Sequence, residues 1–251
     1  MRVSVLSSGS KGNTTYIETD NAKILIDIGN TSKYVKEKLE DFGVKPEELD
    51  GILITHTHID HVKGLKVFEN KYKVPVYITD IMYKQLDYLD SYVPLSDEFD
   101  INDIHITSIK TSHDTEDSRG YVISNNSSSI VYITDTGYIN KKYFDILSNR
   151  NLYIMESNHD VEMLSNGRYP FQLRQRILSD KGHLSNYDSS KYLSTFIGNN
   201  TKCIMLAHLS EENNTEELAY NTLIDRLNSD NKRTPDIIIL KQDKETELIS
   251  V

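Results

Sequence analysis

Short apolar runs of four to seven residues recur along the whole chain. Some alternate with polar residues, as half-buried strands do, and others, such as Ile24-Leu25-Ile26, are apolar throughout. Glycine, asparagine and serine clusters bound many of them and indicate turns. The pattern predicts strands at residues 2–6, 14–19, 22–28, 51–54, 74–78, 104–108, 120–124, 130–134, 152–155, 202–206, 236–240 and 247–251.

Between these runs, apolar residues return every three or four positions, which is the spacing of one helical face. Val35, Leu39 and Phe42 form such a face. Ser185–Asp188 and Asn213–Glu216 have the spacing of helix-capping boxes. We predict helices at 32–42, 61–72, 81–89, 171–178 and 185–197, and a last helix that opens at residues 213–216. Alternating strands and helices, with no repeat or linker, predict one α/β domain over residues 1–251.

Isolated polar residues stand directly after several of the predicted strands. Asp27, His113, Asp135, Glu156 and His208 are single examples, and the run His56-Thr57-His58-Ile59-Asp60-His61 is the densest. Strand ends can converge at one edge of a sheet, so we expect these side chains to meet there.

The hexapeptide of residues 56–61 predicts a metal site. Alternate residues of a strand share a face, which places His56 and His58 side by side, and the turn into a helix brings Asp60 and His61 to an adjoining point. Two neighbouring ligand groups are what a pair of divalent ions requires. Imidazole and carboxylate ligands suit Zn²⁺, and also Mn²⁺ or iron. The competing interpretation is a polar loop rich in histidine, and a lone His113 or His208 is more often a packed or surface residue.

Composition limits the class of protein without naming its partner. The chain has 251 residues and a formal net charge of -10, which argues against a protein that coats nucleic acid but does not exclude a nuclease. No apolar stretch approaches the ~20 residues of a membrane span, and residues 1–7 lack the apolar region of a signal peptide. The single cysteine, Cys203, fits a reducing compartment, so we expect a cytoplasmic protein without a membrane partner.

The residues so far resemble the signature of the metallo-β-lactamase superfamily. Thr55 to His61 match its central motif, with Asp27 before it and His113, Asp135 and His208 after it in the expected order. The resemblance implies a four-layer αββα sandwich, one metal ion held by His56, His58 and His113, and a second held by Asp60, His61 and His208. Asp135 would bridge the two ions, and Asp27 would orient a ligand.

Three further stretches resemble the YycJ/WalJ family within that superfamily: residues 6–13, residues 156–160, and the pair 182–186 and 207–213. No cysteine stands at a metal position, which speaks against the common β-lactamases. The interval from His113 to Asp135 leaves little room for the tRNA-binding arm of ribonuclease Z. The chain is also too short for the additional domain of the β-CASP nucleases.

The resemblance to this family implies a 5′→3′ DNA exonuclease with a part in DNA repair, acting on DNA in preference to RNA. In the implied reaction, a hydroxide between two divalent ions (Zn²⁺ or Mn²⁺) attacks the phosphodiester. Asp60 belongs to this catalytic centre. His183, polarised by Glu156, would protonate the leaving oxygen, as a matching pair does in ribonuclease Z. For His183 the alternative is a residue that bonds to backbone at a helix start.

We expect substrate contacts from two regions. Ser8, Ser10 and Asn13 form a loop suited to a terminal phosphate. The stretch from Arg168 to Lys191 carries a net charge of +3 and is a candidate track for the phosphate backbone, although such a run is often only a solvated helix face. The expected substrate-binding residues are Ser8, Ser10, Asn13, His159, Arg174, Arg176, Lys181, Ser185 and Asn186.

Three alternatives to a DNA exonuclease stay open: a ribonuclease, a hydrolase of a small lactone, thioester or cyclic phosphodiester, and a scaffold with a structural metal. An apolar pocket over the metals would favour the small-molecule hydrolase. A structural zinc site usually closes with four protein ligands, which argues against the scaffold. The oligomeric state is left open.

Overall fold

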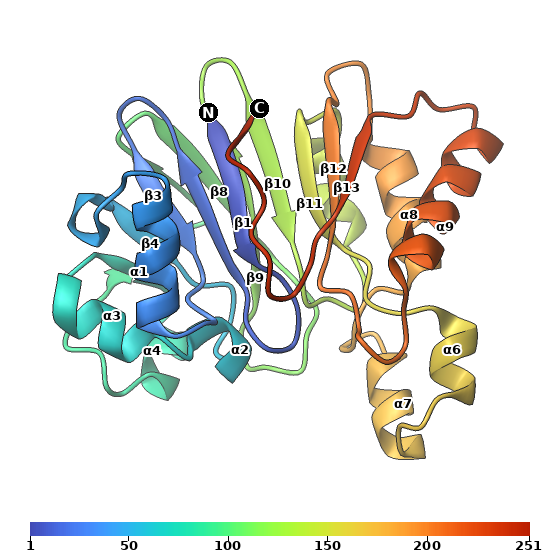
Figure 1. Ribbon diagram of the computed structural model, residues 1–251, viewed down its shortest axis with the longest axis horizontal. Coiled ribbons are helices and arrows are strands. Elements are labelled where there is room, and N and C mark those ends of the chain that lie inside the picture. Colours follow the sequence, from blue (N-terminus) through green and yellow to red (C-terminus); the bar gives the residue numbers. More distant parts are fainter.

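Fourteen strands form two seven-stranded sheets in the computed structural model, which describes residues 1–251 (Figure 1). The first sheet has the order β14-β1-β2-β3-β4-β5-β6 and the second the order β13-β12-β11-β10-β9-β8-β7. The strands of the first sheet are β1 (Arg2–Ser7), β2 (Thr14–Glu18), β3 (Lys23–Ile26), β4 (Gly51–Leu53), β5 (Val76–Ile78), β6 (Val93–Pro94) and β14 (Ile249–Ser250). Those of the second are β7 (Glu98–Ile101), β8 (Ile104–Lys110), β9 (Arg119–Ser124), β10 (Ser129–Ile133), β11 (Leu152–Glu156), β12 (Cys203–Ala207) and β13 (Asp236–Ile239).

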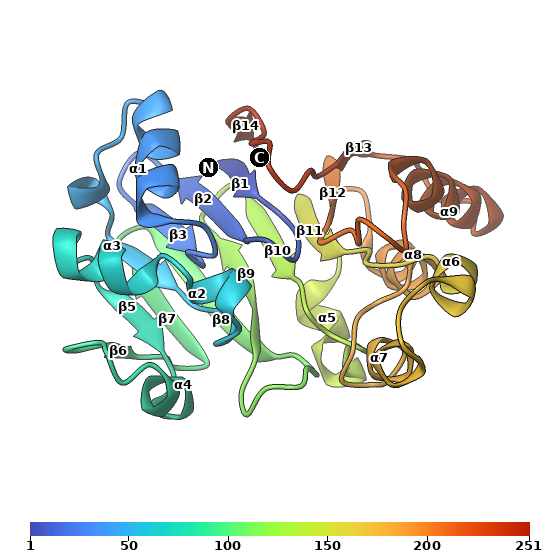
Figure 2. The ribbon, with the colours of Figure 1, turned by 60° about the horizontal axis from the view of Figure 1, so that its bottom comes forward.

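Helices cover the outer face of each sheet (Figures 1 and 2). The first sheet is covered by α1 (Ser32–Asp41), α3 (Leu65–Tyr72) and α4 (Asp80–Gln85), and the second by α5 (Phe144–Leu147), α8 (Asn186–Phe196) and α9 (Glu216–Ser229). Three short helices lie toward the edge of the sandwich where the polar residues gather: α2 (Ile59–Val62), α6 (Val161–Asn166) and α7 (Phe171–Ile177).

Alternating residues of the same strand belong to different layers, which explains the sandwich. In β11, Leu152 and Ile154 pack between the sheets, whereas Tyr153 and Met155 pack against the outer helices. In β3, Leu25 faces the helices and its neighbours face the second sheet. The strands are therefore apolar on both faces, and the predicted αββα sandwich is confirmed.

Most predicted elements are present within a residue or two, with three corrections. The helix predicted at 81–89 ends at Gln85, as α4. The predicted helix at 61–72 is two helices, α2 and α3, interrupted at Gly64. A Cβ on Gly64 would lie 2.2 Å from the Asn30 carbonyl oxygen, so the chain needs glycine at this close approach. The last helix is capped by Thr215, whose side chain accepts from the Leu218 N–H, and not by Asn213. No element was predicted at β6, β7, α5 or α6. None of the helices has the length and apolar character needed to cross a membrane.

Candidate metal centre

Three of the predicted ligands and supports share an unusual backbone conformation just beyond a strand. Asp27 follows β3, Asp135 follows β10 and His208 follows β12, with φ values of 59°, 53° and 56°. Left-handed backbone at a non-glycine residue costs on the order of 1 kcal/mol and clusters at functional sites. At these three positions it accompanies the turn of the chain out of the sheet, at the edge where the polar residues gather.

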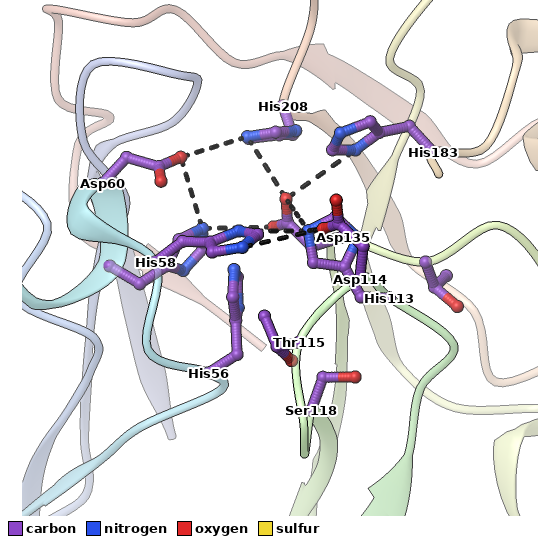
Figure 3. A network of polar contacts seen from close by, with 12 residues as sticks. His56, His58, Asp60, His113, Asp114, Thr115, Ser118, Asp135, His183 and His208 are labelled. Carbon is purple, nitrogen blue, oxygen red and sulfur yellow. Dashed lines mark hydrogen bonds and ion pairs between the residues drawn. The ribbon is translucent and has the colours of Figure 1, made fainter. Parts of the chain in front are cut away.

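His56, His58 and His113 form the first group of potential ligands (Figure 3). His58 Nδ1 and His113 Nε2 lie 3.3 Å apart, and one ring nitrogen from each of the three histidines falls within 4.8 Å of the other two. His113 Nδ1 lies 3.1 Å from the Gly182 carbonyl oxygen, and His56 Nδ1 lies 3.1 Å from Thr55 Oγ1. These contacts occupy one nitrogen of His56 and of His113 and leave the Nε2 atoms of both turned toward the centre.

Asp60, His61 and His208 form the second group. Asp60 Oδ2 lies 3.6 Å from His61 Nε2 and 3.7 Å from His208 Nε2. Asp135 lies between the two groups, with 3.2 Å from its Oδ2 to His61 Nε2 and 3.9 Å from its Oδ1 to His113 Nε2. The structure thus brings all seven predicted ligands to one place, in the two groups that the family resemblance implies.

Asp27 supports His61 from behind. Its Oδ2 atom accepts from His61 Nδ1 at 2.7 Å, and the same carboxylate accepts from the backbone N–H and the hydroxyl of Thr55 at 2.8 and 2.7 Å. Burial lowers the pKa of His61, but the carboxylates of Asp135 and Asp27 outweigh it and raise that pKa to about 10. Asp27 therefore fixes the orientation of the ring and leaves Nε2 directed at the centre.

Glu156 joins His183 and His208. Its Oε1 atom accepts from His183 Nδ1 at 2.7 Å and from His208 Nδ1 at 3.1 Å, while Oε2 accepts from the backbone N–H groups of Thr136 and Leu184. Burial alone would raise the pKa of Glu156, but the charge and hydrogen bond of His183 lower it to about 2. The ionised carboxylate thus holds both imidazoles by their Nδ1 atoms.

The donor set fits divalent metal ions. His56 Nε2, Asp135 Oδ2 and His208 Nε2 are buried and have no hydrogen-bond partner. Buried polar atoms are rarely left unpaired, because each costs about 1–3 kcal/mol. Imidazole nitrogens and carboxylate oxygens directed at a common point would be satisfied by such ions. Cys203 is buried elsewhere, between the sheets, and contributes no sulfur ligand.

A cavity of about 290 Å³ opens beside the centre. It lies between α7, the following turn and the segment after His208, and its walls include Ser10, Arg176, Lys181, His183, Glu211 and Glu212. Three expected substrate-binding residues, Ser10, Arg176 and Lys181, therefore do face the space next to the ligands. The lining mixes both signs of charge with a few apolar side chains such as Leu173.

The other expected substrate-binding residues are placed differently. Ser8, Asn13, His159, Ser185 and Asn186 are buried, and Arg174 does not line the cavity but donates to the Ser165 carbonyl. Ser8 Oγ accepts from the His208 N–H at 2.9 Å, and Asn13 bonds to Gly9 and lies 3.0 Å from His61 Nε2. Their loop folds beneath the ligands and supports them, so it does not offer these side chains to a phosphate.

The three buried residues farther along the chain also have structural partners. Ser185 caps α8, and Asn186 bonds to Ser157 and Asn214. His159 Nδ1 lies 3.3 Å from Asn158 Oδ1, and burial lowers the pKa of His159 to about 4. The sequence around these three residues carries no sign of the partners that bury them.

Asp114 is a site residue that the sequence did not reveal (Figure 3). Its Oδ1 atom lies 3.4 Å from His113 Nε2 and 3.6 Å from His58 Nε2, and its other oxygen pairs with Arg176 on α7. Partial burial raises the pKa of Asp114, but the hydrogen bond from Arg176 and the nearby histidines outweigh it and lower that pKa. Asp114 thus connects α7 to the first ligand group. The only sequence signal was its position next to His113.

Comparisons with known proteins agree with this architecture. Residues 8–165 match the family described as the metallo-beta-lactamase superfamily. The chain is 40% identical over 236 residues to exodeoxyribonuclease WalJ of Streptococcus pneumoniae, covering 90% of this chain and 88% of the relative. It is 39% identical over 227 residues to exodeoxyribonuclease YycJ of Bacillus anthracis, covering 87% and 86%. The crystal structure of the metallo-beta-lactamase fold protein YhfI from Bacillus subtilis superposes with a TM-score of 0.76 at 16% identity, covering 98% of this chain and 99% of that one.

Proposed function

Because the chain belongs to the metallo-β-lactamase superfamily and is a metal-dependent hydrolase, we propose that it is a 5′→3′ DNA exonuclease that works with two divalent ions. The observation that carries the proposal is the likeness to two relatives named exodeoxyribonucleases, over nearly the full length of both. Beside the ligands, Arg176 and Lys181 offer cationic side chains to a phosphodiester, although Glu211 and Glu212 balance their charge in the same cavity.

The ligand assignment follows the two groups around Asp135. His56, His58 and His113 would hold one ion, Asp60, His61 and His208 the other, and Asp135 would contact both. Bound Zn²⁺ or Mn²⁺ would supply Lewis acidity and an acidified water molecule. Asp27 and Glu156 then act on the ligands His61 and His208, whose rings they keep in one orientation.

His183 is the group that we assign to the leaving oxygen. Its side chain lines the cavity and retains some exposure, and its Nδ1 atom is held by Glu156 at 2.7 Å. Burial lowers the pKa of His183, but the negative charge of Glu156 outweighs it and raises that pKa above the usual value. The raised pKa favours the protonated ring that a general acid requires.

Arg176 and Lys181 are the candidates for contact with the phosphate. Both side chains are exposed and line the cavity next to His183. Lysine meets a phosphate as a point charge, and arginine meets it as a planar fork with paired donors. Arg176 is paired with Asp114, so a phosphate that enters would compete for the same guanidinium.

We also propose a role in DNA repair, from the resemblance to the YycJ/WalJ family, and action in the cytoplasm, because the single cysteine is free. A single catalytic domain over residues 1–251 is proposed because the two sheets share one core. DNA is the expected polymer because both relatives are named exodeoxyribonucleases.

The decisive experiment is digestion of DNA duplexes and single strands labelled separately at the 5′ and the 3′ end, with and without a 5′ phosphate. We expect metal-dependent release of short products from the 5′ end by the wild type, and loss of this activity in Asp60→Ala. Matched RNA strands and a cyclic dinucleotide serve as competing substrates. Identical digestion patterns for wild type and Asp60→Ala would overturn the nuclease proposal. Faster turnover of RNA or of the cyclic dinucleotide than of DNA would show that DNA is not the preferred substrate.

A further inference from the structure

Two adjoining hollows lie away from the metal ligands, along the segment between β10 and α5 and the facing edge of α8. One has a volume of about 600 Å³ and lies against Phe144 of α5 and Lys191 of α8. The other, of about 270 Å³, reaches back to the end of β8 at Lys110. Both are lined by Tyr138 and Asn140, so the two hollows adjoin, and we treat them together as one groove. We call it the lysine groove, formed by Lys110, Tyr138, Lys141, Lys142, Tyr143 and Lys191.

The lysine groove is basic on a strongly acidic protein. Its four lysines are exposed, and Asp188 is the single carboxylate residue in its walls, which leaves a local charge of +3 on a chain whose net charge is -10. None of the four lysines belongs to an ion pair of the structure. Clustered lysines that have no carboxylate partner favour the binding of a polyanionic ligand.

Aromatic side chains stand between the lysines. Tyr138 is 41% exposed, and its hydroxyl has no hydrogen-bond partner in the protein. Tyr143 is more buried: its hydroxyl accepts from the Lys110 N–H, and Lys142 Nζ lies 4.7 Å above its ring. Aromatic faces between cations are the pattern that binds single-stranded nucleic acid, because bases stack on the rings while the cations meet the phosphates.

The lysine groove begins at the loops that carry two metal ligands. Ser112, next to His113, donates its N–H to Thr136 Oγ1 at 3.0 Å, and its carbonyl accepts from the Gly137 N–H at 2.9 Å. Tyr138 is only three residues beyond Asp135. A Cβ on Gly137 would lie 2.3 Å from the backbone of Asp180, so the turn after α7 packs onto this joint. The lysine groove therefore adjoins the same turn as the catalytic cavity, which is lined by Lys181 and Gly182. In Figure 2, α5, α7 and α8 lie on one side of the second sheet.

We propose that the lysine groove holds the uncut continuation of the substrate strand, as single-stranded DNA several nucleotides long. This inference rests on the proposed exonuclease function and adds a second contact region to the cavity. Single-stranded DNA suits the groove better than a rigid duplex, because only unpaired bases expose their faces to Tyr138.

The test compares Lys141→Glu/Lys142→Glu with a control that makes the same charge change on the opposite helical layer, Lys33→Glu/Lys71→Glu. Binding of fluorescent single strands of 4 and 20 nucleotides is followed by anisotropy at several salt concentrations, and cleavage of the same strands by product analysis. For the groove variant we expect at least 10-fold weaker binding of the 20-mer. The slope of log binding constant against log salt concentration should be smaller by about 1.4, because two phosphate contacts are lost. Turnover of p-nitrophenyl thymidine 5′-phosphate should stay near normal. The control should bind the 20-mer within about twofold of the wild type. Lys33 and Lys71 lie on α1 and α3, which cover the first sheet, and salt screens exposed charges that are far from the bound strand.

A second variant, Tyr138→Ala, tests stacking without a change of charge, and we expect it to weaken 20-mer binding by about 5-fold or more. Groove variants that bind the 20-mer like the control, or lose equally on 4-mer and 20-mer, would overturn the inference. So would a groove that binds polyglutamate but not DNA. A wild type that binds single strands through the groove but cleaves none would overturn the proposed function alone.

Discussion

Glu156 holds two histidines that have different proposed roles, His183 as proton donor and His208 as metal ligand. One carboxylate oxygen holds both His183, which lines the cavity, and His208, which is assigned to a metal ion. The two imidazoles are stacked with ring centroids 5.3 Å apart, so one anion orients a proton donor and a ligand together. Changes at His183 and at Glu156 should consequently have different effects on metal content.

Replacing His183 by Asn should lower the rate of DNA cleavage by about 10²–10³-fold, because the leaving oxygen loses its proton donor. Metal content should stay at the wild-type level, since His183 is not among the assigned ligands. The loss should shrink to a few-fold on p-nitrophenyl thymidine 5′-phosphate, whose leaving group departs as a stable anion. Steady-state rates on both substrates, with metal analysis by mass spectrometry, check this. An equal loss on the two substrates would remove His183 from the role of general acid.

Asp27→Asn should weaken metal binding by about 10–100-fold, because the amide orients the ring of His61 less strongly than the carboxylate does. Titration of metal against a competing chelator measures the affinity. Asp103→Asn, an exposed carboxylate whose partners are Thr19 and Asn21, provides the control and should bind metal normally. Unchanged affinity in Asp27→Asn would mean that Thr55, whose Oγ1 lies 3.1 Å from His61 Nδ1, orients the ring without the carboxylate.

The meeting of the seven predicted ligands at one edge could be expected from the sequence, because they follow strands whose apolar pattern is visible. The placement of Ser8 and Asn13 could not be expected, since their fate depends on His208 and His61, 200 and 48 positions away. Asp114 was missed for a similar reason: its role arises from contact with His58 and with Arg176 on α7, which no local pattern announces.

At the scale of elements, tertiary contacts explain why two helix boundaries differ from those predicted from the sequence. The helix predicted at 61–72 has a continuous apolar face, but Asn30 approaches at Gly64 and divides it. The capping box predicted at residues 213–216 would place the cap of α9 at Asn213, two residues before the observed cap. Asn213 is buried and its carbonyl accepts from the Asp160 N–H, which leaves Thr215 as the cap.

Thr215→Ala should therefore lower the free energy of unfolding by about 1 kcal/mol, because the N–H of Leu218 loses its acceptor at 3.1 Å. Thr195→Ala is the matched control: this exposed threonine lies inside α8 and bonds only to the Lys191 carbonyl. Alanine has the higher helix propensity, so the control should be neutral or slightly stabilising. Denaturant midpoints measure both, and equal losses in the two variants would argue against Thr215 as the cap.

At the scale of the molecule, the metal centre joins the two sheets. His56 to His61 follow β4 of the first sheet, whereas His113, Asp135 and His208 follow strands of the second. Bound ions would connect the layers at this edge, while apolar residues of both sheets form one core between them. The layers are thus coupled by packing along their length and by ligands at one end.

Removal of the metal should therefore lower the stability of the whole chain and not only of the edge. A ligand present at 1,000 times its dissociation constant stabilises the native state by about 4 kcal/mol, which corresponds to a fall in Tm of about 8 °C or more on chelation. Because the core between the sheets is shared, unfolding should remain a single transition with or without metal. Calorimetry before and after chelation, with metal analysis of both samples, measures this. In His208→Ala, chelation should lower Tm by less than in the wild type, because the variant lacks one of the histidines assigned to the second ion. Two separate transitions would contradict a single domain, and an unchanged Tm after proven loss of metal would contradict the coupling of the sheets through the centre.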